Sequence, residues 1–381
     1  MVSLADVLGL AGVQVSATPT VIEVSIGSLP EQRSFTFRVR PTAVDLDAIA
    51  RMDDLVQDVL DRRIDAGAAL ERLAGIEAHP LRRPWFVRLA AYGLAGAAVT
   101  PVLGGGWHEL IAGGLVGLLV GAVALLVRPG ARAEPMIAPL AAVAASFGAA
   151  LLAELGLNAS PDVVTLAALV TFLPGMALTI GMRELATEHL QSGVANTANA
   201  LVQLLGLVVG VSVGRSVALS WFGISHQVTP HNAFGGTHVL GALAAGLAFT
   251  VTLRAQSKAA PIMCSATVLA VLANAAGKAL FGAAAGVFVA ALAIGVVGGL
   301  VGAGLHRTPL VFIVPGVLIL VPGSAGFNSL LQLLTGQTVS GIDAGFDTFV
   351  TAMSIAYGLM VSAVILPRRF TEVHPRPSAG T

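Results

Sequence analysis

The pattern of hydrophobic and polar residues changes near residue 84 and divides the chain into two regions. In the first region, three stretches alternate apolar and polar residues in the manner of strands: 13–18, 20–26 and 34–40. Over 45–78 the apolar residues recur at helical spacing, and Gly67 is expected to separate two helices. The pattern therefore predicts a small cytosolic α+β domain over residues 1–84.

The second region consists of long apolar runs separated by short loops. Ten such runs follow residue 84: 85–100, 108–127, 136–156, 162–181, 194–221, 237–254, 259–276, 280–305, 309–322 and 345–366. About 20 apolar residues cross a bilayer as a helix, and the short ninth run counts as a span because 327–334 can continue it. The predicted fold is an α-helical polytopic membrane protein with ten transmembrane helices. Five lie in 85–221 and five in 237–366, and 367–381 form a cytosolic tail.

Composition supports a membrane protein and excludes other classes. The chain of 381 residues is 55% hydrophobic and only 11% charged, with a mean hydropathy of +0.84. Soluble domains carry about 25% charged residues, so this sequence could not cover a water-facing surface. The 21 basic and 21 acidic residues cancel, which gives no indication of nucleic-acid binding. The single cysteine, Cys264, excludes an internal disulfide framework, and no cofactor or metal site is expected.

Positive charges lie on alternate sides of the predicted bundle. They precede the first span and follow the second, fourth, sixth, eighth and tenth: Arg82, Arg83, Arg88, Arg128, Arg132, Arg183, Arg254, Lys258, Arg307, Arg368 and Arg369. The loops 101–107, 157–161, 222–236 and 323–344 contain no Lys or Arg, and only Lys278 departs from the alternation. By the positive-inside rule, both termini are expected in the cytoplasm, in a protein of the cell (plasma or inner) membrane.

One short pattern occurs twice in the membrane region. Each copy has a Pro-Gly pair inside an apolar run and a Ser-Gly pair further on: Pro174-Gly175 with Ser192-Gly193, and Pro322-Gly323 with Ser340-Gly341. The offset is constant at 148 residues (322 − 174 and 340 − 192). Proline removes an N–H and glycine allows unusual dihedral angles, so each Pro-Gly pair predicts a break in a membrane helix.

The repeat has consequences for architecture and function. Because each copy contains five spans, the second copy should enter the membrane from the opposite face, as in inverted-repeat transporters. Interrupted helices at matching positions indicate a substrate or gate site. Ser192 and Ser340 are expected to cap the helices that follow, and a free helix N-terminus there would suit a carboxylate. The alternative is that these residues serve packing alone.

Polar residues near each Ser-Gly pair form a second candidate feature. Asp343 and Asp347 lie four residues apart in the second copy, whereas the first copy has the neutral residues Asn196, Asn199 and Gln203. Asp347 corresponds to Asn199 under the repeat (347 − 148). Such a strip can bind a zwitterion, and one carboxylate can carry a coupling proton. Asp343 could instead only cap a helix end.

Charged residues near the spans provide further candidates. Arg215 lies toward the outer end of the fifth span, where an ion pair with Asp347 and contact with a substrate carboxylate are equally open alternatives. Arg183 and Glu184 follow the first Pro-Gly pair on the cytoplasmic side, as either a gate or ordinary juxtamembrane charge. Glu109 is expected at the outer membrane interface.

The remaining patterns favour packing over chemistry. Two glycine series recur at every fourth residue and would let helices approach closely: Gly113, Gly117 and Gly121, and Gly206, Gly210 and Gly214. Residues 210–214 match the G-x-S-x-G string around Ser212, but a nucleophile elbow needs a strand-to-helix turn, so no catalytic residue is expected. His226, His231 and His238 share one outer loop region, without the spacing or acidic partner of a metal site.

Taken with the repeat, short stretches of sequence resemble the threonine/serine exporter family. They are the strand Thr-Pro-Thr-Val-Ile-Glu-Val-Ser at 18–25, the helix end Leu-Ala-Gly-Ile at 73–76, and the Pro-Gly and Ser-Gly pairs of each half. The resemblance covers nearly the whole chain, and some members consist of two polypeptides, one per half. It implies secondary transport of threonine and serine out of the cytoplasm, driven by the proton gradient. The positions it carries over are the two Pro-Gly and the two Ser-Gly pairs.

The family usually begins with an additional amphipathic helix, and only residues 4–10 could represent its end here, so we expect a shortened chain. The expected partners are a small-molecule substrate, protons and the lipid bilayer, and a homo-oligomer stays open. Three other functions also stay open at this point. They are transport of a small dicarboxylate or other organic acid, an intramembrane serine hydrolase, and a structural or sensory role in which the soluble domain binds a regulator.

Overall fold

The computed structural model describes residues 2–28, 30–39, 44–127, 132–223, 237–305, 308–320 and 322–366. The first region contains three strands and three helices: α1 (Val2–Val7), β1 (Gln14–Ala17), β2 (Val21–Ile26), β3 (Arg33–Arg38), α2 (Leu46–Leu60) and α3 (Ala66–Ala78). The strands form an antiparallel sheet in the order β1-β2-β3, with Val24 opposite both Val15 and Phe35. The three predicted strands are confirmed.

The separation between the two helices of this region lies earlier than predicted. Arg62 adopts a left-handed conformation (φ 55°) after the end of α2. The side chain of Asp65 then accepts a hydrogen bond of 2.8 Å from the backbone N–H of Ala68 and caps α3. Gly67 therefore lies in the first turn of α3, and the prediction that it separates the helices is wrong.

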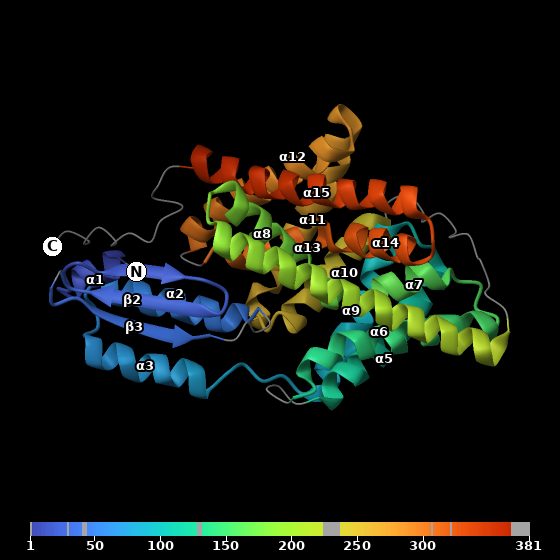
Figure 1. Ribbon diagram of the computed structural model, residues 1–381, viewed down its shortest axis with the longest axis horizontal. Coiled ribbons are helices and arrows are strands. Elements are labelled where there is room, and N and C mark those ends of the chain that lie inside the picture. The colour runs from blue at the N-terminus through green and yellow to red at the C-terminus, as the bar shows by residue number, and fades with distance from the viewer. Residues whose placement is uncertain are drawn as a thin grey trace.

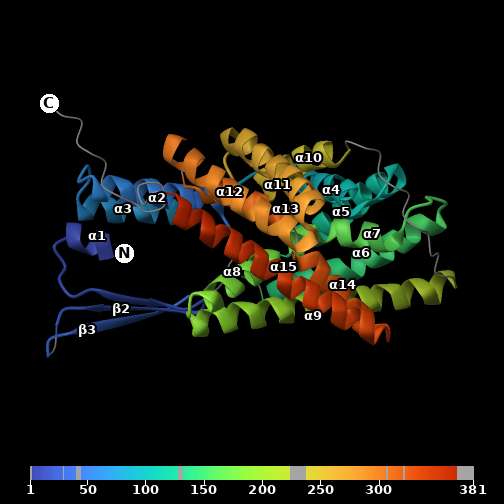
Figure 2. The same ribbon diagram turned by 90° about the horizontal axis from the view of Figure 1, so that it is seen from above.

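The second region is a bundle of apolar helices (Figures 1 and 2). The helices are α4 (Trp85–Val99), α5 (Trp107–Leu126), α6 (Ile137–Glu154), α7 (Pro161–Ala168), α8 (Gly175–Ala186), α9 (Leu190–Phe222), α10 (Thr237–Thr252), α11 (Ala260–Phe281), α12 (Ala283–Leu305), α13 (Leu310–Leu320), α14 (Pro322–Leu334) and α15 (Thr338–Ile365). Within the described ranges, eight helical segments are long and apolar enough to cross a membrane, or nine if α7 and α8 form one bent span. The shorter apolar helix α10 lies where the sixth span is predicted. The chain is therefore a multi-pass membrane protein with a small sheet.

The two halves of the bundle use equivalent helix pairings. In the first half α4 packs on α5, α5 on α6, α6 on α9 and α8 on α9. In the second half the equivalent contacts join α10 to α11, α11 to α12, α12 to α15 and α14 to α15. Between the halves, α4 meets α10, and the contact of α8 with α15 is matched by the contact of α9 with α14. Helices that correspond under the 148-residue shift thus have corresponding neighbours.

The glycine series lie at these helix crossings. A Cβ atom added at Gly117 would lie 2.6 Å from the carbonyl oxygen of Tyr92, on α4. One added at Gly210 would lie 2.8 Å from the Cβ of Ala142, on α6. Since real side chains would clash at such distances, the glycines allow the close approach that packing requires. Ser212, between the last two glycines of its series, donates to the carbonyl of Val208 within α9, so its string lies inside a helix.

The N-terminal helix α2 is anchored to the connection between α10 and α11. Leu46, at the start of α2, is 1% exposed and belongs to a hydrophobic cluster with Phe249. Its N–H donates to the carbonyl of Leu253 at 3.0 Å. The side-chain amide of Gln256 donates to Asp47 at 2.7 Å. This end of the bundle also holds the sheet and the C-terminal end of α15 (Figure 2).

Candidate functional site

The two Pro-Gly pairs, 148 residues apart in the sequence, lie against each other in the folded chain. A Cβ atom added at Gly323 would lie 3.0 Å from the Cβ of Leu173 and 3.1 Å from the backbone nitrogen of Gly175. Both glycines are buried, and Leu173 belongs to the same hydrophobic cluster as Phe327 on α14. The repeat therefore brings the start of α8 and the start of α14 into backbone contact.

The first Pro-Gly pair breaks its helix as predicted. After α7 ends at Ala168, a short 3-10 helix covers Val170–Phe172, Leu173 is extended, and α8 begins at Gly175. The axes of Pro161–Ala168 and Val170–Ala186 are bent by 48°, just ahead of the Pro-Gly pair. The hydroxyl of Thr171, inside this break, is buried without a hydrogen-bond partner among the described residues. Among the described residues, the break thus leaves a buried hydroxyl whose hydrogen-bonding capacity is unused.

In the second copy, α13 ends at Leu320 and α14 begins at Pro322, with Val321 outside the described residues. Together α13 and α14 form one apolar segment long enough to cross a membrane, Leu310–Leu334. The predicted continuation of the ninth span over 327–334 is confirmed as part of α14.

The two Ser-Gly pairs lie inside the first turns of α9 and α15 and do not cap them. These helices begin at Leu190 and Thr338, two residues before each serine. The chain reverses direction earlier, at two equivalent positions with left-handed backbones, Glu188 (φ 63°) and Gly336 (φ 82°). Because the helices have already begun when the serines are reached, the capping prediction for Ser192 and Ser340 is wrong.

The glycines of the Ser-Gly pairs close two equivalent helical hairpins. A Cβ atom at Gly193 would lie 2.8 Å from the backbone nitrogen of Leu185, on α8. A Cβ atom at Gly341 would lie 3.0 Å from the backbone nitrogen of Leu333, on α14. These distances leave no room for a side chain, so each glycine sets how closely α8 approaches α9 and α14 approaches α15.

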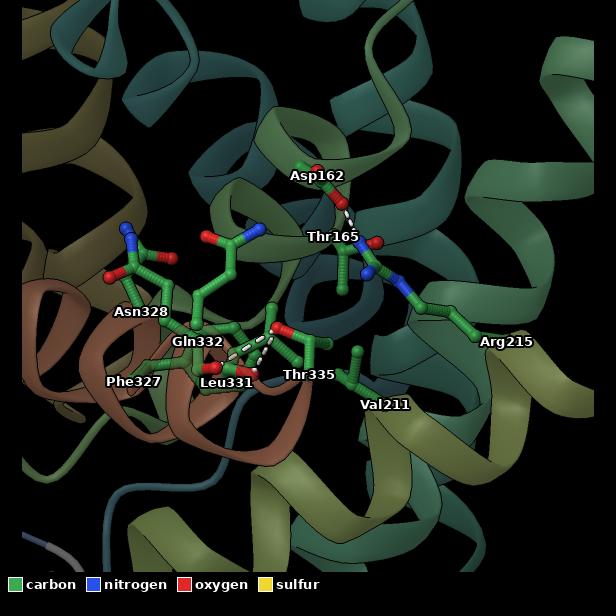
Figure 3. A pocket seen from close by; sticks show the side chains of 10 residues that line it. Asp162, Thr165, Val211, Arg215, Phe327, Asn328, Leu331, Gln332 and Thr335 are labelled. Atoms are coloured by element: carbon green, nitrogen blue, oxygen red, sulfur yellow. Dashed lines mark hydrogen bonds and ion pairs between the residues drawn. The ribbon is translucent and has the colours of Figure 1, made fainter. Parts of the chain in front are cut away.

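A polar cavity of about 360 Å³ lies between α7, α9 and α14 (Figure 3). Its lining comprises Asp162, Thr165, Val211, Arg215, Phe327, Asn328, Leu331, Gln332, Thr335 and Gln337. Arg215 extends from α9 and forms an ion pair with Asp162, in the first turn of α7. Both side chains remain partly exposed, at 36% and 69%.

Amide and hydroxyl groups supply the rest of the polarity of this cavity. Gln332 extends from α14 toward the α7 side (Figure 3), and its Oε1 atom is buried without a partner among the described residues. Asn328 lies one turn earlier on the same helix and is exposed. The hydroxyl of Thr335 donates to the carbonyls of Leu331 and Gln332. The cavity therefore offers one cation, one anion and an amide with unused hydrogen-bonding capacity.

A buried carboxylate holds the backbone next to this cavity. Glu109 is fully buried. One of its oxygens accepts from the N–H of Gly106 at 2.9 Å, at the start of α5, and the other accepts from the N–H of Ser160 at 3.1 Å. Ser160 is the residue before α7, two positions ahead of Asp162. The carboxylate of Glu109 is therefore occupied by backbone donors inside the protein, and its predicted position near the outer membrane interface stays a prediction.

Comparison with known proteins identifies the family. A family model described as "Putative threonine/serine exporter" matches residues 1–218, and a second, described as "Threonine/Serine exporter, ThrE", matches residues 235–365. The chain belongs to the threonine/serine exporter family. The family resemblance inferred from the sequence is thus confirmed.

The individual relatives of this exporter-family chain are distant in sequence. The "Threonine/serine exporter" of Corynebacterium glutamicum is 26% identical over 328 residues, which cover 82% of this chain and 66% of that protein. The "Probable threonine/serine exporter" of Mycobacterium tuberculosis is 25% identical over 371 residues, which cover 91% and 68%. An uncharacterized protein of Schizosaccharomyces pombe is 26% identical over 208 residues, 52% of this chain and 25% of that protein. The chain thus spans about two thirds of the two bacterial relatives, and no solved structure matches it.

In this exporter-family chain, Arg215 is the predicted site residue that lines the cavity. Its pairing with Asp162 corrects the alternative in which it pairs with Asp347. Asp347 and Asp343 are exposed on α15 and do not line the cavity. The reason is geometric, since α7, α9 and α14 form the cavity and α15 contributes no side chain to it.

The other predicted polar residues lie near the start of α9 and the end of α8. The amide of Asn196 donates to the carboxylate of Glu184 at 2.7 Å, which joins α9 to α8. Arg183 is exposed in the last turn of α8, and Asn199 and Gln203 are exposed on α9. His226 and His231 lie outside the described residues, and His238 is exposed on α10. Within the described ranges, no cluster of three or more His, Cys, Asp or Glu residues could hold a metal.

Sequence reasoning missed Asp162, Thr165, Asn328 and Gln332. Asp162 follows a serine and a proline at the start of a helix, where an acidic residue is ordinary. Asn328 and Gln332 are four residues apart and therefore on one face of α14. That spacing in an otherwise apolar segment is the one signal that could have found them. Their convergence with Arg215 depends on the packing of three helices, which the sequence does not reveal.

Proposed function

We propose that this protein is a secondary transporter that exports threonine and serine from the cytoplasm, coupled to the proton gradient. The observation that carries the proposal is the contact between the two Pro-Gly pairs, where buried backbones of both halves meet. Broken helices at matching positions are how many secondary transporters build a solute site. The unpaired hydroxyl of Thr171 at the first break supports the same reading, since a passing polar solute could satisfy it. Membership of the threonine/serine exporter family gives the substrate class.

The proposed architecture is ten transmembrane helices in two inverted repeats. The bent pair α7 and α8, together with the short α10, would complete ten spans with the eight longer segments. The equivalent helix pairings of the two halves support a repeat. Five spans per half would then place the second half in the opposite orientation. The positively charged loops, and the position of the sheet at the same end as the end of α15, support cytoplasmic termini.

In this proposal the four residues Pro174, Gly175, Pro322 and Gly323 form the gate that the substrate passes. The hairpin glycines and the serines beside them, Ser192, Gly193, Ser340 and Gly341, fix how the gate helices move against α9 and α15. Asn196, with Glu184 and Arg183, would form the polar surface at the cytoplasmic side. Asn199 and Gln203 continue this strip along α9, and Asp347 and Asp343 carry the coupling proton on α15.

The cavity favours an amino acid over a dicarboxylate. Its one cationic side chain, Arg215, is already paired with the carboxylate of Asp162. A dicarboxylate entering the cavity would meet Asp162 as a like charge, whereas a zwitterion would bring both signs of charge. Ordinary zwitterionic amino acids are therefore the substrate class that the site supports best.

Transport in proteoliposomes tests the proposal. Purified protein should exchange labelled threonine in counterflow, and a pH gradient should drive accumulation that an ionophore abolishes. Serine should compete with labelled threonine, and succinate should not. Protein-free liposomes give the background, and Ser212→Ala should retain transport because Ser212 only bonds within its own helix. Absence of threonine counterflow, or competition by succinate equal to that of serine, would reject the proposed substrate.

A further inference from the structure

The cavity between α7, α9 and α14 contains charge of both signs in a partly exposed ion pair. Charges that remain in contact with water gain little from pairing, because solvent screens them. Asp162 and Arg215 are exposed by 69% and 36%. A ligand that carries its own ammonium and carboxylate could therefore replace this pair at low cost. Asp162 and Arg215 would each exchange the other for a charged group of the ligand, so neither charge would become unpaired.

The cavity also contains hydrogen-bonding capacity that the described residues do not use. The Oε1 atom of Gln332 is buried and has no partner among them. A buried amide group without a partner is costly. A hydroxyl can donate a hydrogen bond to this oxygen. An apolar side chain of the same size could not.

Size and position are those of a small-molecule site. Ligand pockets typically measure about 300 to 1,000 Å³, and this one measures about 360 Å³. Phe327 and Val211 give it an apolar wall. Its lining comes from α7, just before the first Pro-Gly pair, and from α14, just after the second. A change of angle at the first break, or a movement of the start of α14 against it, would therefore change the cavity.

We infer that this cavity is a binding site for a zwitterionic hydroxy amino acid, in which Arg215 binds the carboxylate, Asp162 the ammonium group and Gln332 the side-chain hydroxyl. The inference deepens the proposed export function and rests on it for the choice of threonine as the ligand. The site forms when Asp162 and Arg215 separate to admit the substrate between them. Asn328 faces the same cavity and provides a second amide beside Gln332.

Three analogues of threonine, each lacking one group, test these assignments one by one. 1-Amino-2-propanol lacks the carboxylate, 3-hydroxybutyrate lacks the ammonium group and 2-aminobutyrate lacks the hydroxyl. Each is used as a competitor of labelled threonine in counterflow with the full chain in proteoliposomes. The wild-type protein should prefer threonine over each charge-deleted analogue by about 10- to 150-fold, the range expected for hydrogen bonds to charged groups.

Each variant should lose the preference for one group alone. Arg215→Gln should no longer distinguish threonine from 1-amino-2-propanol, while it still rejects 3-hydroxybutyrate. Asp162→Asn should show the reverse, and Gln332→Leu should lose the preference for threonine over 2-aminobutyrate. Lys278→Gln, which removes an exposed cation at the end of α11, is the matched control and should retain every preference. A merely structural ion pair would change stability or overall rate in all assays and would leave these ratios intact.

The outcomes separate this inference from the proposed function. Threonine transport by the wild type with unchanged preferences in all three variants would overturn the inference and leave the exporter function standing. If the wild type transports no threonine, the proposed function fails. Thermal stabilisation of the detergent-solubilised protein by threonine, serine and alanine then tests the cavity directly. Stabilisation that disappears in Asp162→Asn and Arg215→Gln would support a zwitterion site, and its absence in the wild type would overturn the inference too.

Discussion

The cavity face and its counterpart under the repeat are built from equivalent helices with different side chains. On the cavity face, α7, α9 and α14 present Asp162, Arg215 and Gln332. A shift of 148 residues converts Asp162 to Leu310 and Arg215 to Ala363, on α13 and α15. The two halves thus share a helix arrangement, whereas the ion pair belongs to one face. The repeat therefore accounts for the helix arrangement, whereas the chemistry that we assign to the cavity depends on charged residues that only the cavity face carries.

One packing contact also differs between the halves. Its glycine and its hydroxyl-bearing residue lie on opposite helices in the two copies. In the first half Gly181 lies against Thr197, and in the second half Ser329 lies against Gly345. These positions correspond under the repeat, with the glycine moved from one helix to the other. The contact between α8 and α9, like that between α14 and α15, tolerates one small hydroxyl side chain opposite one glycine. Steric fit is therefore preserved even where residue identity is not.

The largest expected effect comes from separating the two halves at the point where they touch. In Gly323→Val the new Cβ would lie 3.0 Å from the Cβ of Leu173 and 3.1 Å from the backbone nitrogen of Gly175, so that the two segments would have to move apart. We expect loss of threonine counterflow and a destabilisation of about 1–3 kcal/mol, as for other overpacked sites, measured by transport and by thermal unfolding in detergent. Gly304→Val is the control, since nothing lies within 4 Å of a Cβ atom there. Normal transport by Gly323→Val would show that close contact of the two Pro-Gly pairs is not needed.

The acidic residues of α15 provide a sharper functional contrast between the halves. Asp347→Asn makes the second half resemble the first, where Asn199 is the equivalent residue. If Asp347 carries the coupling proton, the variant should still exchange labelled threonine for unlabelled threonine. It should no longer accumulate threonine in response to a pH gradient. Asp54→Asn, at an exposed position on α2, is the control. Undiminished accumulation in both Asp347→Asn and Asp343→Asn would contradict proton coupling through these residues.

Substitution of Glu109 tests whether the cavity face depends on a buried carboxylate, which the equivalent position in the other half lacks. The equivalent residue under the repeat is Ser257. Glu109→Gln replaces one acceptor oxygen by an N–H donor facing a backbone N–H, and we expect a cost of about 1–3 kcal/mol in unfolding free energy. Threonine affinity should weaken as well, because the loop that leads to Asp162 loses its support. Ser257→Ala should change stability by no more than about 0.5 kcal/mol. Equal effects of the two substitutions would contradict this contrast.

The sequence predicted the features that depend on local patterns. Alternation located the three strands, apolar length located the helices, and Pro174 marked the break between α7 and α8. The starts of α9 and α15 were misplaced because the chain reverses before the Ser-Gly pairs, at Glu188 and Gly336. The first reversal is especially hard to predict, since a glutamate rarely adopts a left-handed conformation. The cavity was missed for a different reason. Asp162 and Arg215 are ordinary residues at their own helix positions, and their meeting is set by how α7 packs against α9.

The smallest expected effect on stability comes from removing the hydroxyl groups of Ser329 and Thr197, which face glycines in the two halves. The hydroxyl of Ser329 donates to the carbonyl of Gly341 at 2.7 Å, whereas that of Thr197 is buried without a partner among the described residues. Ser329→Ala should therefore cost about 0.5–1.5 kcal/mol of unfolding free energy. Thr197→Val keeps the shape and removes an unpaired polar group, so it should leave stability unchanged or raise it. If both substitutions destabilised the protein equally, the two contacts would be energetically equivalent. The difference between the halves would then be confined to the cavity face.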